Sequence, residues 1–265
     1  MRPRIAIPVP HSGDPEYAGR SLPQYERAVE KAGGEPVPIP LDKTPGEVMK
    51  LIEHCDAVLL PGSRADVDPA KYDAARQSHT AASDPGRDTV DELLLQDAYN
   101  MKKPVLGICY GLQMLNVYRS GTLMQHIESA INHAAGRKVA VAHTVEVDRN
   151  SKLARILSQG GREGHGLRRA ETSNKNTGAS APEGNAIAIP VNSSHHQSAD
   201  VIGDGLRAVA RCPEDGIVEA VEGMSPDHFV LAVQWHPERS IDDEEPSRAI
   251  FRALVEAARA RRKLT

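Results

Sequence analysis

The sequence has few cysteines and no excess of positive charge. Its 32 lysines and arginines stand against 36 aspartates and glutamates, for a formal net charge of −4, with no basic block. We therefore expect no nucleic-acid partner. The three cysteines, Cys55, Cys109 and Cys212, are odd in number and widely spaced. This argues against a disulfide framework and a Cys-x-x-Cys metal clip, and it favours a reducing compartment.

Long hydrophobic runs are also missing. No stretch approaches the roughly 18 apolar residues of a membrane span, and the apolar run after Met1 is too short for a signal peptide. We expect a cytoplasmic protein that does not contact a membrane. The sequence shows no internal repeat, and one α/β domain can account for its 265 residues. We therefore predict a single domain over residues 1–265.

Apolar runs of strand length alternate with amphipathic stretches of helix length in the first half of the chain. This alternation predicts βα units around a mostly parallel sheet. The predicted strands lie near 4–9, 36–39, 57–60 and 104–108. The predicted helices lie near 22–32, 45–54 and 87–101, and a further helix runs from Cys109 to about Tyr118.

From residue 137 onward, short apolar runs separated by turn residues replace this pattern. They predict an antiparallel extension of the sheet, with strands at 139–141, 144–147, 186–189, 206–210, 217–221 and 230–233. A closing helix is expected from Glu244 to Arg262, with Ile250, Leu254 and Ala258 on one face. Residues 160–186 have few side chains able to offset the cost of ordering the backbone. We predict a flexible insertion there, with a functional lid as the alternative.

A candidate nucleophile stands in the segment Gly107-Ile108-Cys109-Tyr110-Gly111. The predicted strand before it would deliver Cys109 to a strand-to-helix turn, which exposes the sulfur to a substrate. The flanking glycines would let the turn form without side-chain clashes, and the helix N-terminus would favour the thiolate. Most free cysteines are small core residues. We keep that interpretation for Cys55 and Cys212, which lack such surroundings.

A candidate base lies in Gln234-Trp235-His236-Pro237-Glu238. Pro237 would turn the chain out of the sheet, so that His236 and Glu238 could point the same way. The carboxylate could then hold one imidazole nitrogen while the other faces the thiol. A lone histidine is more often structural, but the elbow elsewhere in the chain favours a catalytic role.

Together these two segments resemble the class I glutamine amidotransferases. Three further segments are similar to the γ-glutamyl-γ-aminobutyrate hydrolase branch, also called the peptidase C26 family: 61–69 with Tyr72, Arg87-Asp88, and 191–197. The resemblance covers about residues 4–255 without the 160–186 segment. It implies a flavodoxin-like three-layer sandwich with a mostly parallel central sheet.

The resemblance also implies a catalytic triad of Cys109, His236 and Glu238. The sulfur would attack a γ-glutamyl amide carbonyl, and water would then hydrolyse the γ-glutamyl thioester, with His236 moving the protons. An oxyanion hole would combine the N–H of Tyr110 with one from the loop at Gly62 and Ser63.

Substrate binding is implied for residues that in amidotransferases touch the glutamyl head group, namely Gln113, Ser194 and His195. Each has a structural alternative, since Gln113 could be an ordinary helix residue and the other two could shape a turn. We interpret His196 as structural. Asp66 and Asp68 are expected to be turn residues, because two carboxylates alone make a weak metal site. No metal or cofactor is predicted.

The chain departs from the common family pattern at a few positions. Ser63 stands where many members have a second glycine, and Tyr110 follows the nucleophile where arginine or leucine is frequent. The leading functional hypothesis is a cysteine-dependent hydrolase of γ-glutamyl amides, acting on a small molecule and perhaps as a homodimer. The alternative is a glutaminase subunit that delivers ammonia to a separate synthase, and a catalytically silent binding protein is the third class.

Overall fold

The computed structural model describes residues 1–160 and 185–263, where a nine-stranded sheet forms the centre. The strand order is β2-β1-β3-β4-β11-β10-β9-β6-β7, and the first five strands run parallel. These five are β2 (Glu35–Ile39), β1 (Arg4–Pro8), β3 (Ala57–Leu60), β4 (Val105–Ile108) and β11 (Val230–Val233). The antiparallel extension consists of β10 (Val218–Gly223), β9 (Leu206–Arg211), β6 (His143–Asp148) and β7 (Ala186–Val191).

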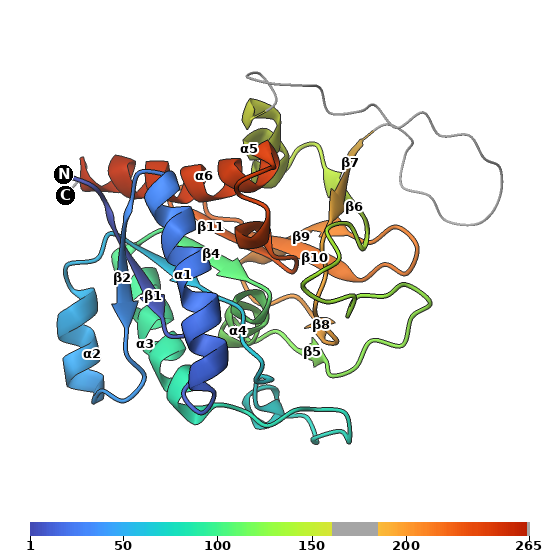
Figure 1. Cartoon of the computed structure of the whole chain (residues 1–265), viewed down its shortest axis with the longest axis horizontal. Coiled ribbons are helices and arrows are strands. Elements are labelled where there is room, and N and C mark those ends of the chain that lie inside the picture. The colour runs from blue at the N-terminus through green and yellow to red at the C-terminus, as the bar shows by residue number, and fades with distance from the viewer. Residues whose placement is uncertain (161–184, 264–265) are drawn as a thin grey trace.

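Helices cover both faces of this sheet, which makes the three-layer sandwich that the sequence predicted (Figure 1). One face carries α1 (Pro15–Lys31), α5 (Lys152–Gly160) and α6 (Glu245–Arg262). The other carries α2 (Pro45–Ile52), α3 (Pro85–Met101) and α4 (Tyr110–Tyr118). The parallel order 2-1-3-4 followed by one further strand is that of flavodoxin-like folds. A small separate pair joins β5 (Leu123–Met124) to β8 (Ser198–Ala199).

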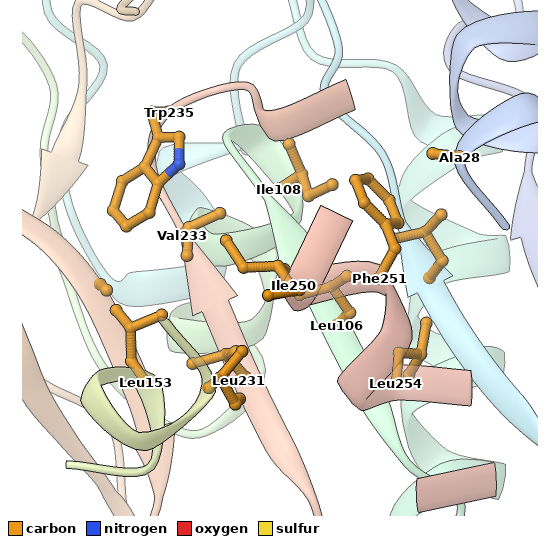
Figure 2. Packing of buried hydrophobic residues seen from close by; sticks show 14 of the residues in the cluster. Ala28, Leu106, Ile108, Leu153, Leu231, Val233, Trp235, Ile250, Phe251 and Leu254 are labelled. Carbon is orange, nitrogen blue, oxygen red and sulfur yellow. The ribbon is translucent and has the colours of Figure 1, made fainter. Parts of the chain in front are cut away.

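Alternation along the central strands divides the core between the two faces. Leu106 and Ile108 of β4 pack toward α6, whereas Val105 belongs to the cluster on the opposite face. Figure 2 shows Phe251 and Leu254 of α6 against this part of the sheet. All residues of β3 and β4 are buried, which explains why both read as continuous apolar runs in the sequence. The closing helix is confirmed with its predicted apolar face.

The structure corrects three elements of the sequence-based prediction. Helix α1 begins at Pro15, well before residue 22, because the Asp14 side chain caps it by accepting from the Tyr17 N–H (2.8 Å). No strand forms at 139–141, where Val139 and Val141 are exposed. Helix α5 was not predicted, although the Ser151 hydroxyl caps it by accepting from the Ala154 N–H (2.9 Å).

Most of the predicted insertion at 160–186 lies outside the described residues. Among the residues described, no helix combines the length and apolar character that crossing a membrane requires. What the fold provides for function is one edge of the parallel sheet. The carboxyl ends of β3, β4 and β11 lie side by side there, and ligand sites of open α/β sheets form at such edges.

Candidate active site

Cys109 occupies a sharp turn between β4 and α4. Its φ of 53° and ψ of −106° lie in the positive-φ region that residues other than glycine rarely adopt. Hydrogen bonds hold the turn, because the Cys109 N–H donates to the Val233 carbonyl (2.8 Å) and its carbonyl accepts from the Leu112 N–H (3.0 Å). Backbone strain of this kind concentrates at functional sites. The predicted strand-to-helix elbow is therefore present.

The two glycines beside the elbow let helix α4 approach the sheet. A Cβ on Gly111 would lie 2.2 Å from the Leu60 carbonyl oxygen, and one on Gly107 would lie 2.7 Å from the Gly111 carbonyl oxygen. Both neighbours are backbone atoms, so β3 or α4 would have to shift. The positive φ is carried by Cys109 itself, and the glycines are needed for close packing.

A buried arginine fixes the loop after β3 beside the elbow. The Arg87 guanidinium donates to the Pro61 carbonyl (2.7 Å) and to the Asp91 carboxylate (2.7 Å). It also lies over the Tyr110 ring, 4.9 Å from the ring centroid, and the Tyr110 hydroxyl donates to Asp88. The Arg87-Asp88 pair thus joins α3 both to the Pro61 loop and to the start of α4.

His236 and Glu238 form a buried pair just after β11. His236 Nδ1 lies 2.8 Å from Glu238 Oε1. Asn192 fixes the histidine backbone, since its side chain donates to the His236 carbonyl (2.9 Å) and accepts from the His236 N–H (3.0 Å). The carboxylate accepts the Nδ1 proton, so Nε2 presents its lone pair. Within the described part of the chain, Nε2 has no hydrogen-bond partner.

The nucleophile and the base meet because their strands are neighbours. β4 and β11 pair in parallel with Ile108 opposite Val233, so Cys109 and the turn that holds His236 leave the same sheet edge. Gly62, after β3, marks how closely the chain is packed there. A Cβ on Gly62 would lie 3.1 Å from His236 Cε1 and 3.6 Å from Cys109 Cβ.

Burial controls the protonation of this pair. Burial raises the pKa of the Cys109 thiol to about 12, against a smaller lowering by the nearby Arg239 charge. Burial also lowers the pKa of the His236 imidazole. Both groups are therefore neutral at pH 7 in this state. This corrects the expectation that the helix N-terminus favours a thiolate, because desolvation outweighs the helix end.

The three residues expected at the oxyanion hole differ in what their N–H groups do. Tyr110 is the first residue of α4, and its N–H faces the Cys109 sulfur. The Gly62 N–H is already committed, because it donates to the buried Tyr25 hydroxyl at 3.0 Å. The Ser63 N–H makes no hydrogen bond within the described ranges. Tyr110 and Ser63 are therefore the better donors, and Gly62 would first have to release Tyr25.

The residues expected to bind substrate are also placed unequally. Gln113 donates from Nε2 to the Gln197 carbonyl (3.1 Å), within the polar layer behind the elbow. The half-buried Ser194 hydroxyl accepts from Arg239 (2.8 Å). The His195 ring is buried, and its Nδ1 donates to the Gln197 carbonyl at 2.9 Å. That ring faces a buried cluster around Glu219 able to hold a metal ion, instead of an open site.

Sequence reasoning missed Arg239. Its guanidinium lies 3.5 Å from Glu238 Oε1 and reaches Ser194, and its charge is the strongest influence lowering the pKa of the Cys109 thiol. Its position directly after Glu238 was the available signal. The contact to Ser194 depends on tertiary structure, because β7 and β11 are far apart in sequence.

Comparison with known proteins agrees with this geometry. The peptidase C26 family model matches residues 10–238. The chain belongs to the peptidase C26 family. Members of this family are hydrolases, and the resemblance drawn from the motifs is thereby confirmed.

Individual relatives carry related names. A protein of Mycobacterium tuberculosis, provisionally named a glutamine amidotransferase, is 34% identical over 91% of this chain and 68% of its own length. The γ-glutamyl-γ-aminobutyrate hydrolase PuuD of Escherichia coli is 30% identical over 88% of this chain and 84% of its own. A solved structure from Thermoplasma acidophilum, described as belonging to a GMP synthase, covers 100% of this chain and 98% of its own. Its TM-score is 0.63 at 14% identity, which speaks for the fold alone.

Proposed function

We propose that this chain hydrolyses γ-glutamyl amides through a triad of Cys109, His236 and Glu238. The observation that carries the proposal is the meeting of a strained cysteine elbow with a buried His–Glu pair on adjacent parallel strands. The PuuD relative supports the substrate class, because its name assigns a γ-glutamyl amide as substrate.

The reaction begins with a neutral thiol and a neutral imidazole. As the Cys109 sulfur attacks the amide carbonyl, its proton passes to His236 Nε2, which Glu238 leaves free by holding Nδ1. The carbonyl oxygen becomes an oxyanion that the N–H groups of Tyr110 and Ser63 stabilise. The C–N bond then breaks, and His236 gives the proton to the leaving amine, which leaves a γ-glutamyl thioester.

Hydrolysis of the thioester reverses the proton movements. His236 Nε2 takes a proton from water, and the water oxygen bonds to the acyl carbon. The C–S bond breaks, the sulfur recovers its proton from His236, and glutamate is released. Glu238 stays ionised throughout, because its charge stabilises the imidazolium that forms twice in each turnover.

The decisive experiment is a substrate panel. We expect purified protein to release amine from γ-glutamyl-γ-aminobutyrate or related γ-glutamyl amines faster than ammonia from glutamine. Cys109→Ala should abolish release, and Cys212→Ala, a buried cysteine outside the elbow, should leave it unchanged. Release by Cys109→Ala at the rate of the unmodified protein would remove the nucleophile from the proposal.

The name of the Mycobacterium tuberculosis relative favours one second candidate, a glutaminase that supplies ammonia to a synthase. The same triad would serve, since glutamine is itself a γ-glutamyl amide. Slow release from every γ-glutamyl amine in the panel, with a preference for glutamine, would support this candidate over the first.

A further inference from the structure

A second group of buried histidines lies behind the candidate active site. His133, His143 and His195 surround Glu219, and all four side chains are almost fully buried. Three nitrogens approach one carboxylate oxygen, Glu219 Oε1: His143 Nε2 at 3.0 Å, His133 Nδ1 at 3.2 Å and His195 Nε2 at 3.6 Å. The reaction proposed above uses none of these groups.

The outward nitrogens of two of these rings are already committed as donors. His133 Nε2 lies 2.8 Å from the Asp215 carboxylate, and His195 Nδ1 lies 2.9 Å from the Gln197 carbonyl. Carboxylates and carbonyls only accept hydrogen bonds, so these two nitrogens carry the ring protons. In neutral rings the inward nitrogens therefore present lone pairs. This pattern, an imidazole held by a carboxylate or a carbonyl, is typical of metal ligands.

Three acceptors thus converge on one buried point. His133 Nδ1, His195 Nε2 and a Glu219 oxygen lie within 4.8 Å of one another. Within residues 1–160 and 185–263, neither inward nitrogen has a hydrogen-bond partner, although both lie near the carboxylate. Buried acceptors that face one another without a donor are costly, so a positive charge must lie between them.

We propose that His133 Nδ1, His195 Nε2 and Glu219 bind a divalent transition-metal ion, with Zn²⁺ as the expected occupant. Imidazole and carboxylate ligands suit zinc, and tetrahedral bonds of about 2.0 Å place ligand atoms about 3.3 Å apart. The His133 and His195 nitrogens lie 3.2 and 3.6 Å from Glu219 Oε1, close to that spacing. His143 donates from Nε2 to the same carboxylate and orients it.

Such an ion would stabilise the wall behind the candidate active site. The His133 carbonyl accepts from the Ser193 hydroxyl (2.6 Å) and from the His195 N–H (2.9 Å), so the ion adds to an existing link between two loops. The Glu219 carbonyl accepts from the Gln234 N–H (2.8 Å), two residues before His236. The role is structural, because the ligands are buried away from solvent.

A second set of ligand atoms shares His133 but is a weaker candidate. His133, Cys212 and Asp215 also lie within 4.8 Å of one another. The ring nitrogen on that side already donates to Asp215. His133 Nδ1 makes no aligned hydrogen bond to Glu219 among the described residues, which favours a lone pair on the Glu219 side.

The test is metal binding by the full chain in a Cys109→Ala background, where loss of catalysis cannot affect the result. After chelator treatment and zinc titration, mass spectrometry should find about one zinc ion per chain, and Tm should rise with zinc concentration. Glu219→Gln and His195→Gln should each weaken zinc binding at least about a hundredfold. Asp215→Asn should weaken it about tenfold through His133.

Two controls make the assignment specific. Cys212→Ala and His228→Gln, at a buried histidine that donates to the Lys103 carbonyl, should bind zinc like the parent. If the Glu219 variant fails to fold, Co²⁺ bound to the parent protein should show tetrahedral visible bands without a thiolate charge-transfer band. A parent that binds no zinc, a Glu219→Gln that binds it unchanged, or a thiolate band would each overturn the proposal.

Discussion

The two buried histidine–carboxylate groups of this protein use the same chemical parts differently. At His236, one carboxylate holds one ring, and the other ring nitrogen lies unpaired beside Cys109. Around Glu219, several rings converge on one carboxylate, and two of them are held from outside by further acceptors. The first arrangement leaves a base free to move a proton, whereas the second leaves room only for a bound cation.

The largest expected effect separates the two carboxylates. Glu238→Gln should lower kcat about 10³-fold, because an amide cannot stabilise the imidazolium, while Tm changes little. Glu219→Gln should instead lower Tm and zinc content. Steady-state kinetics and thermal melting of both variants check this. A Glu238→Gln enzyme with normal kcat would contradict the catalytic role of that pair.

A second prediction concerns the packing that makes the elbow. Gly111→Ala should lower the free energy of unfolding by about 3 kcal/mol or more, since the new methyl group would meet the Leu60 backbone at 2.2 Å. Gly19→Ala, in helix α1, is the matched control, because no atom lies within 4 Å of its added Cβ. It should be neutral or slightly stabilising. Equal effects of both in urea denaturation would rule out the close approach at the elbow.

The third prediction uses pH to test the resting state of the nucleophile. Because burial raises the pKa of the Cys109 thiol to about 12, the thiol is protonated throughout the neutral range. Alkylation of Cys109 by iodoacetamide should therefore speed up about tenfold per pH unit between pH values of about 7 and 9. The rate can be followed by mass spectrometry of the Cys109 peptide. A rate that is already constant with pH near 7 would instead show a thiolate–imidazolium pair.

The smallest expected effect concerns Ser194. Its hydroxyl accepts from Arg239, so Ser194→Ala should cost only about 1 kcal/mol of stability and change kcat/KM less than about fivefold. Paired measurements of KM and kcat decide its role. A large rise in KM at unchanged kcat would show that Ser194 contacts the glutamyl head group, as the family resemblance implied.

Much of the fold could be predicted because its signals are local. The runs that form β3 and β4 are apolar at every buried position, and Ile250, Leu254 and Ala258 repeat at helical spacing. The missed features depend on contacts. Val139 and Ala140 resemble a strand but find no pairing partner in the described sheet, and α1 begins early because Asp14 caps it.

The same division holds for the two histidine groups. His236 and Glu238 are two residues apart, so the sequence alone indicated that they could pair. His133, His143, His195 and Glu219 come from four separate segments, and no spacing in the sequence predicts that they meet. The sequence thus determined the nucleophile, its base and the family. Only the tertiary structure decided the neutral resting state of Cys109 and the cluster around Glu219, because burial and long-range contacts set both.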